Sequence, residues 1–179
     1  PVATLNPPLW ELGHIGWFQE YWIARNPQRG RGRHADPEVA RPPSIRADGD
    51  ALYHSSRVAH AARWSLPLPT ADATRADLAQ QLETTLDLLS SSGGSDEALY
   101  FFRLALFHED MHHEAALYMA RALDIDRPDP RWQPRRCTLP GGGLSVEPGR
   151  HRLGHAGPGF AFDNEEEAHE VAVEAFHID

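Results

Sequence analysis

Four segments of the chain space their apolar side chains at helical intervals, and this periodicity constrains the fold more than any other feature. Helices are expected over about residues 6–26, 48–64, 70–91 and 95–123, with a long polar loop between the first two. Residues three and four apart lie on the same face of a helix, so each segment has an apolar stripe that must be buried. Four such helices predict a bundle.

The last two helices have the most clearly defined expected core faces. In the third, the buried stripe is expected to be Leu78, Leu82, Leu86 and Leu89. Ser95 is expected to cap the fourth helix through its side-chain oxygen. The expected inward face of that helix consists of Phe101, Leu104, Ala105, His108, Met111, His112, Ala115, Tyr118, Met119 and Ala122.

The texture of the sequence changes at Pro140, where glycine-rich turns and short alternating segments replace the helical pattern. Residues 144–146 and 150–154 lie between these turns, and the alternating apolar pattern over 170–178 predicts a strand. We therefore expect an α+β chain: a helical bundle over residues 1–128, a linker over 129–139, and the start of a β-rich domain over 140–179. Because the alternating pattern is still running at Asp179, we expect the chain to be a piece of a longer protein.

Net charge, hydropathy and cysteine content limit the partners and the location expected for the protein. With 17 Lys+Arg against 26 Asp+Glu the formal net charge is −9, whereas a nucleic-acid site needs a basic face. No apolar run approaches the roughly 20 residues of a membrane-spanning helix, so no membrane partner is expected. Cys137 is the single cysteine, which fits a reducing, cytoplasmic location.

Three histidines fall on the expected inward faces. His108 and His112 are four residues apart and project from the same side of the fourth helix. His14 lies among Trp10, Trp17 and Phe18 on the first helix and also points inward. Three imidazoles converging from two helices in an apolar interior predict a mononuclear metal site.

Two other interpretations of these histidines stay open. Residues 108–112 match the H-E-x-x-H pattern of zinc peptidases, in which Glu109 would be the general base. The downstream glycine and third histidine of the extended pattern are missing, because an uninterrupted helix follows. Alternatively, the histidines are core residues without a metal. His113 is expected to be exposed, and nothing in their spacing singles out His54 or His60 as ligands.

Several motifs, in this order and spacing, resemble the iron-dependent sulfoxide synthases of ergothioneine biosynthesis and the related selenoneine synthases. They are the stretch 12–20 around His14, the pattern His108-x-x-x-His112-x-Glu114, and the segment 160–171 with its Phe160-Ala161-Phe162-Asp163-Asn164-Glu165 opening. The resemblance covers nearly the whole chain. It implies a DinB-like four-helix bundle followed by the start of a domain similar to the formylglycine-generating enzyme, which has a C-type-lectin-like fold.

The resemblance also implies an activity. His14, His108 and His112 would bind one ferrous ion, and Glu114 would orient a ligand imidazole. The reaction would be an O₂-dependent oxidative coupling at C2 of the hercynine imidazole, with the catalytic residues in the part of the family's second domain that this chain does not reach. A zinc-dependent DinB thiol transferase is the alternative from another class.

Two departures from the family pattern bear on the sulfur or selenium donor. Met111 stands where the sulfoxide synthases commonly carry a glutamine that helps to hold hercynine. The stretch 78–82 carries no arginine for a γ-glutamylcysteine donor, whose carboxylates should need cations. These departures, and the segments 52–57 and 63–69, favour a selenosugar, which Ser55, Ser56, Gln80 or Gln81 could hydrogen-bond. A sulfoxide synthase that uses γ-glutamylcysteine or cysteine is the alternative.

Overall fold

The structure, a computed structural model, describes residues 2, 4–126, 128–132 and 142–178. It divides into two compact units, Pro1–Asp126 and Arg127–Asp179. Cys137, most of the expected linker and Pro140, where the second domain is expected to begin, lie outside the described residues. None of the helices in the described ranges is both long enough and apolar enough to span a membrane.

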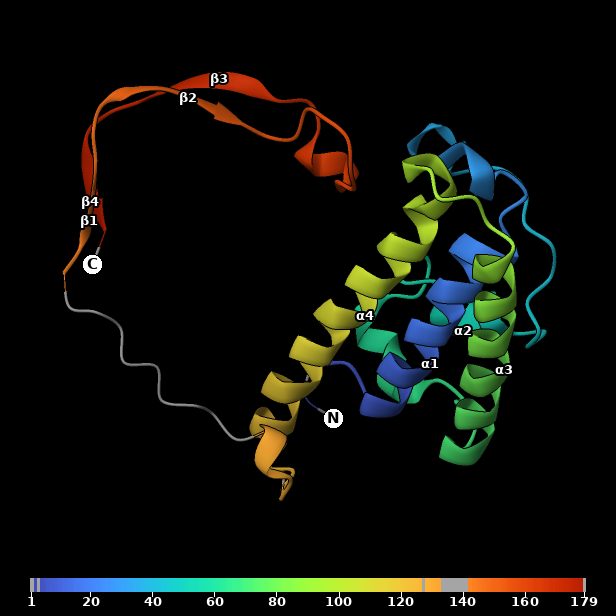
Figure 1. The fold of residues 1–179 in the computed structure, drawn as a ribbon. Helices are drawn as coiled ribbons and strands as arrows, with labels where there is room; N and C mark the ends of the chain where they lie inside the picture. Colours follow the sequence, from blue (N-terminus) through green and yellow to red (C-terminus); the bar gives the residue numbers. More distant parts are fainter. Residues whose placement is uncertain (1, 3, 127, 133–141, 179) are drawn as a thin grey trace. The chain divides into compact units, whose positions relative to one another are not determined.

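Three long helices form the first unit. Helix α1 (Pro8–Gln19) continues into a π-helical turn, η1 (Glu20–Ala24), and packs against both α3 (Ala71–Ser90) and α4 (Asp96–Ala122), as Figure 1 shows. The predicted helical bundle is confirmed.

The helix starts follow from local hydrogen bonding. The side chain of Ser95 accepts a hydrogen bond from the backbone N–H of Ala98 at 3.2 Å, as predicted, and Thr70 does the same for Ala73 at 3.2 Å. Pro8 occupies the first turn of α1, where a missing N–H costs nothing. Each start therefore depends on side chains within three residues of the helix end.

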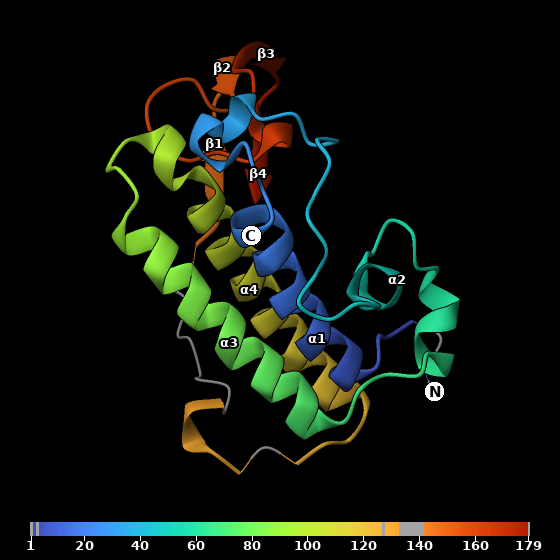
Figure 2. The same ribbon diagram turned by 90° about the vertical axis from the view of Figure 1, so that its right-hand side faces the viewer.

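The expected second helix over 48–64 is wrong as a continuous element. The structure instead has a short helix, α2 (Gly49–Tyr53), and a separate 3₁₀ turn, η3 (His60–Ser65). The carbonyls of Leu52 and Tyr53 accept hydrogen bonds from side chains of α1, and among the described residues no backbone N–H of a following turn donates to them. Figure 2 shows the result, with α1 lying between α2 and α3.

The expected leucine stripe of α3 is also wrong for three of its four members. Leu82, Leu86 and Leu89 are 52%, 53% and 39% exposed, whereas the buried residues of this helix are Thr74 and Gln81. The face of α3 that contacts α1 carries Gln81 and Leu78, which pack against the bare backbone of Gly16; a Cβ at Gly16 would lie 2.2 Å from the Gln81 Oε1 and 2.6 Å from the Leu78 Cδ2.

Leu82 and Leu89 of α3 face an open apolar groove between α3 and α4, with a volume of about 330 Å³. Its lining includes Leu82, Leu89 and Leu106. On α4 the inward face is largely as expected, but Met111, Tyr118 and Ala122 are exposed.

Three clusters of buried apolar side chains make up the core of the first unit. The first of them joins α1 to α2 through aromatic rings. The clusters consist, in turn, of Trp10, Trp17, Leu52 and Tyr53; of Ile23, Phe101, Phe102 and Ala105; and of Leu5, Ala115 and Met119.

Over residues 142–178, the second unit contains two short antiparallel strand pairs. Strand β1 (Leu144–Val146) pairs with β4 (Phe176–Ile178), with Ser145 opposite His177. Strand β2 (Gly149–Leu153) pairs with β3 (His169–Val173), with His151 opposite Val171. The change to antiparallel strands after the bundle confirms the α+β class.

Candidate metal centre

The first candidate ligand, His14, is buried in the middle of α1 and only 4% exposed. Its ring stacks on Trp10, with 4.7 Å between ring centroids, and on Trp17, at 5.9 Å. These neighbours lie four residues before and three residues after His14, so helical spacing alone places the three rings in one column. The aromatic column excludes water from one side of the imidazole.

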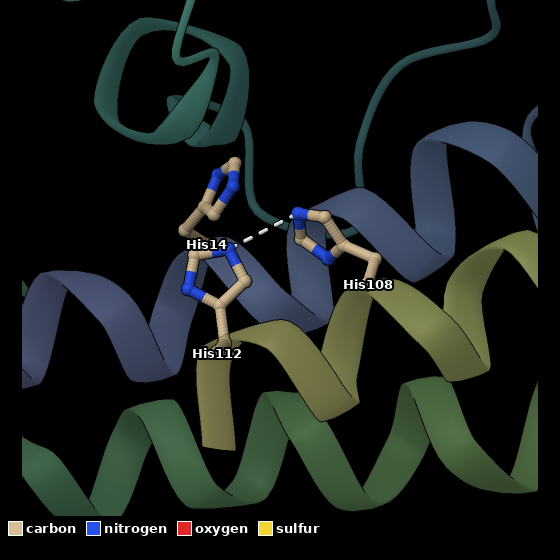
Figure 3. A group of neighbouring side chains, drawn as sticks. All are labelled: His14, His108 and His112. Atoms are coloured by element: carbon tan, nitrogen blue, oxygen red, sulfur yellow. Dashed lines mark hydrogen bonds between the residues drawn. The ribbon is translucent and has the colours of Figure 1, made fainter. Parts of the chain in front are cut away.

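The other two candidate ligands come from α4. His108 is 8% exposed and stacks face to face on Phe18 of α1, with 3.5 Å between centroids. His112 lies one turn further along and is partly exposed. The Nε2 atoms of His108 and His112 are 3.1 Å apart, within hydrogen-bonding distance (Figure 3).

The three histidines form one group, as predicted. One ring nitrogen from each lies within 4.8 Å of the others. Nitrogens that share an ion at about 2.1 Å cannot be more than about 4.2 Å apart. The 3.1 Å pair meets this limit, and the 4.8 Å bound on the whole group lies about half an ångström above it. A donor set of three neutral imidazoles suits iron, zinc and other divalent transition metals.

The outer nitrogens of two of the rings are held by hydrogen bonds. The Nδ1–H of His14 donates to the backbone carbonyl of Tyr53 at 2.9 Å. The Nδ1 of His112 forms a short hydrogen bond with the carboxylate of Glu11, which also accepts from the side-chain amide of Asn6. Metal-binding histidines characteristically present one nitrogen to the ion while the other is fixed in this way. The residues present therefore fit a metal ion bound through Nε2.

Sequence reasoning missed Glu11 as the carboxylate that contacts the group. It is 7% exposed and lies three residues before His14, one turn away on the same helix. A buried acid one turn from an inward histidine was the available signal. Its partner, His112, is 101 residues away in sequence, which no local pattern could indicate.

Electrostatics keep the ligand set ready for a cation. Burial lowers the pKa of His14 to about 4 and that of His108 to about 3, with the neighbouring His112 adding to both shifts. Burial raises the pKa of Glu11, but hydrogen bonds from His112 and Asn6 outweigh it, and the net pKa is lowered. At neutral pH the site thus holds two neutral imidazoles beside a carboxylate, which favours a bound cation.

The remaining acids and histidines on α4 point elsewhere. Glu114 and His113 are exposed. Glu109 lines the groove between α3 and α4, away from the histidine group. Met111 is 53% exposed and immediately precedes His112. Among the described residues, the acid that contacts the histidine group is Glu11, on a different helix from Glu114.

The expected donor-binding residues are dispersed. Ser55 and Ser56 are exposed in the turn that follows α2, and Gln80 is exposed on α3. Gln81 is buried behind α1, where it lines a cavity of about 10 Å³ together with Gly13. Within the described ranges, no hydrogen bond joins these four residues to the histidine group.

His54 and His60 lie outside the histidine group. His54 contacts Trp17 in a tilted arrangement and Tyr21 edge-on, with centroid distances of 5.0 Å and 5.7 Å, and His60 is exposed in η3. Neither belongs to the group of three.

Comparisons with known proteins agree with this centre. No protein-family model matches the chain. The chain is 31% identical over 185 residues to a hercynine oxygenase of Mycolicibacterium smegmatis, an alignment that covers 97% of this chain and 39% of that protein. It is 30% identical over 190 residues to the hercynine oxygenase of Mycolicibacterium thermoresistibile, covering 97% and 38%.

A shorter match, 29% identical over 113 residues, joins it to the hercynine oxygenase of Mycobacterium tuberculosis and covers 63% of this chain and 24% of that protein. The chain therefore spans about two fifths or less of the length of these relatives. It is distantly homologous to hercynine oxygenases.

Proposed function

We propose that this chain carries the iron-binding bundle of an enzyme that oxidatively joins sulfur or selenium to C2 of the hercynine imidazole. The observation that carries the proposal is the group of three histidine nitrogens within 4.8 Å, drawn from α1 and α4. The similarity to hercynine oxygenases supports hercynine as the substrate, and the three-histidine donor set is one that suits iron. Residues 142–178 would then begin a domain similar to the formylglycine-generating enzyme.

The proposed reaction balances with O₂ as the oxidant. The C2–H of hercynine and the X–H of the donor (X is sulfur or selenium) are lost, a C2–X bond and an X–O bond form, and one water is released. A bound ferrous ion supplies electron transfer to O₂ and a common template for the reactants.

The chain's own residues prepare this chemistry. His14, His108 and His112 would occupy one side of the ion and leave its other positions open to ligands. The stacked rings of Trp10 and Phe18 exclude water from the protein side of the site. Glu11 holds the proton on the Nδ1 of His112, so that Nε2 remains available to the ion.

The position of Glu109 argues against the peptidase alternative. A zinc peptidase needs this acid within reach of the metal-bound water. Here Glu109 lines the groove between α3 and α4, and among the described residues the acid hydrogen-bonded to the histidine group is Glu11. The peptidase alternative therefore gains no support from a contact between Glu109 and the candidate ligands.

Metal analysis of anaerobically purified protein tests the assignment. We expect about one iron per chain, and a loss of iron in His14→Ala, His108→Ala and His112→Ala. His113→Ala, an exposed neighbour on the same helix, is the matched control and should retain the metal. Zinc in place of iron would favour the thiol transferase or peptidase alternatives, and no metal would favour histidines that are buried only for packing.

Glu109→Gln separates the peptidase from the proposed oxidase. We expect this variant to retain both iron and hercynine coupling, because the side chain lies outside the histidine group. A loss of activity with the metal still bound would assign Glu109 a catalytic role and contradict the proposal.

We further infer that the donor is a selenosugar. Arg75 is the one arginine on α3, and it is 66% exposed and paired with Asp72, so it is a poor clamp for a dipeptide carboxylate. Ser55 lies two residues after Tyr53, whose carbonyl contacts His14, and Ser55 and Ser56 offer hydroxyls to a neutral sugar. Selenium is also the softer donor atom for a transition metal.

A competition assay with the full-length protein tests the donor. Hercynine, a selenosugar and γ-glutamylcysteine are mixed anaerobically, O₂ is admitted, and the products are resolved by mass. We expect the selenium product to dominate. If the γ-glutamylcysteine product dominates, the enzyme is a sulfoxide synthase of the ergothioneine type.

A further inference from the structure

The short helix α2 is tied to α1 by three hydrogen bonds from aromatic and imidazole N–H groups. Trp10 Nε1–H donates to the carbonyl of Leu52 at 2.7 Å, and His14 Nδ1–H donates to the carbonyl of Tyr53 at 2.9 Å. Trp17 Nε1–H donates to the carboxylate of Asp50 at 2.7 Å. All three donors lie on one face of α1, so α2 contacts the helix along the column of rings that contains the candidate ligand.

The two carbonyls in this set lie at the end of α2, where they have no helical partner. Backbone oxygens in the last turn of a helix must find another donor or water. His54, which follows Tyr53, is extended (ψ 97°), so the chain leaves the helix at this point. Trp10 and His14 supply the missing donors. The termination of α2 and the orientation of the His14 ring are therefore consequences of the same contacts.

The hydrogen bond to Tyr53 fixes which nitrogen of His14 carries the proton. A carbonyl oxygen can only accept, so the Nδ1 of His14 must be protonated and, in the neutral ring, Nε2 must carry the free lone pair. The neighbouring hydrogen bond from Trp10 holds the peptide of Leu52 and Tyr53 in place.

Gly13 makes this approach possible. A Cβ at position 13 would lie 2.3 Å from Cζ of Tyr53 and 2.5 Å from its hydroxyl oxygen. Tyr53 is 4% exposed and belongs to a packed aromatic cluster, so its ring has little room to move aside. The Tyr53 ring therefore packs directly against the backbone of Gly13, in the space that a side chain at this position would fill.

We infer that α2 is a positioning element for the candidate metal centre. The ring of Tyr53 packs against Gly13, and the carbonyl of Tyr53 sets the tautomer and orientation of His14 before any ion binds. This inference rests on the proposed metal-binding role of His14. Gly13 and Trp10 are positioning residues, because they act on the ion through His14.

Imidazole ¹⁵N chemical shifts of the metal-free protein provide the first test. We expect a protonated Nδ1 and an unprotonated Nε2 for His14. Gly13→Ala should displace Tyr53 and give a mixture of tautomers, and Trp10→Phe, which keeps a ring but removes the N–H, should do so with less disturbance of the fold. In a cobalt(II) titration we expect both variants to bind metal about 10-fold or more weakly.

Gly16→Ala is the matched control. It is the same substitution one turn away, but its Cβ would meet Gln81 and Leu78 of α3, not α2. We expect a lower unfolding midpoint with an unchanged His14 tautomer and unchanged cobalt affinity.

The His14 tautomer and the cobalt affinity together distinguish a failure of the positioning role from a failure of the proposed metal-binding function. A wild-type His14 protonated on Nε2, or weaker cobalt binding in Trp10→Phe with the tautomer unchanged, would overturn the positioning role. If His14 has the expected tautomer but the wild-type protein binds no divalent metal, the positioning role in metal binding fails with the proposed function, and only the hydrogen bond from His14 to α2 remains.

Discussion

At the scale of single residues, Glu11 contacts the candidate metal centre through His112. The carboxylate is buried and hydrogen-bonded to the imidazole, an arrangement that makes a histidine a stronger ligand. We predict that Glu11→Gln, which keeps the shape but removes the charge, lowers metal affinity about 10- to 100-fold. Isothermal titration with cobalt(II) measures the change. Glu114→Gln is the control, and a larger effect there would return the orienting role to Glu114.

Asp50 is a second residue whose charge is needed, here for stability. Hydrogen bonds from Arg25 at 2.7 and 2.8 Å lower the pKa of Asp50 to about 2, although burial raises it; the bond from Trp17 also lowers it. Because the folded-state pKa is below the unfolded value of 3.8, this stabilisation is complete above about pH 3.8 and is lost as pH falls through 2. The carboxylate is 45% exposed, which reduces the contribution to about 1 kcal/mol.

We therefore predict that Asp50→Asn is less stable than the wild type by about 1 kcal/mol or more at pH 7, since Arg25 is buried and loses its charged partner. The difference should shrink as the pH approaches 2. Urea unfolding at a series of pH values measures it, and a difference that does not depend on pH would show that the ion pair contributes nothing.

At the scale of elements, α4 carries two of the three candidate ligands and depends on its cap. Ser95 satisfies a backbone N–H at the start of the helix. We predict that Ser95→Ala lowers the free energy of unfolding by about 1 kcal/mol, and Ser95→Gly by only a few tenths. His108 lies 13 residues further on, about 20 Å along the helix, so metal affinity should not change. Urea denaturation and metal titration of the same samples test both statements.

At the scale of the whole molecule, the candidate metal centre joins the first helix of the bundle to the last. An ion bound only by the folded state stabilises it by mass action. At a free metal concentration about 100 times Kd, we predict an increase of about 2.7 kcal/mol in the free energy of unfolding. His14→Ala should abolish the increase, because the remaining ligands both come from α4. An equal increase in that variant would place the bound metal elsewhere.

Features that depend on neighbours within about one helical turn were determined by the sequence itself. The cap at Ser95, the spacing of His108 and His112 on one face, and the change from helices to strands all follow from short-range hydrogen bonding and periodicity. His14 was placed inward for the same reason, since aromatic residues surround it at helical spacing.

Tertiary structure decided the features that depend on partners far apart in sequence. The end of α2 depends on a hydrogen bond between residues 39 positions apart, and the carboxylate beside His112 comes from 101 positions away. The face of α3 that contacts α1 packs Gln81 against Gly16, contrary to the expected leucine pattern. Periodicity shows which side chains can share a face of a helix. Which face is buried depends on the neighbouring helix, because close packing and hydrogen bonding must be satisfied between the two elements.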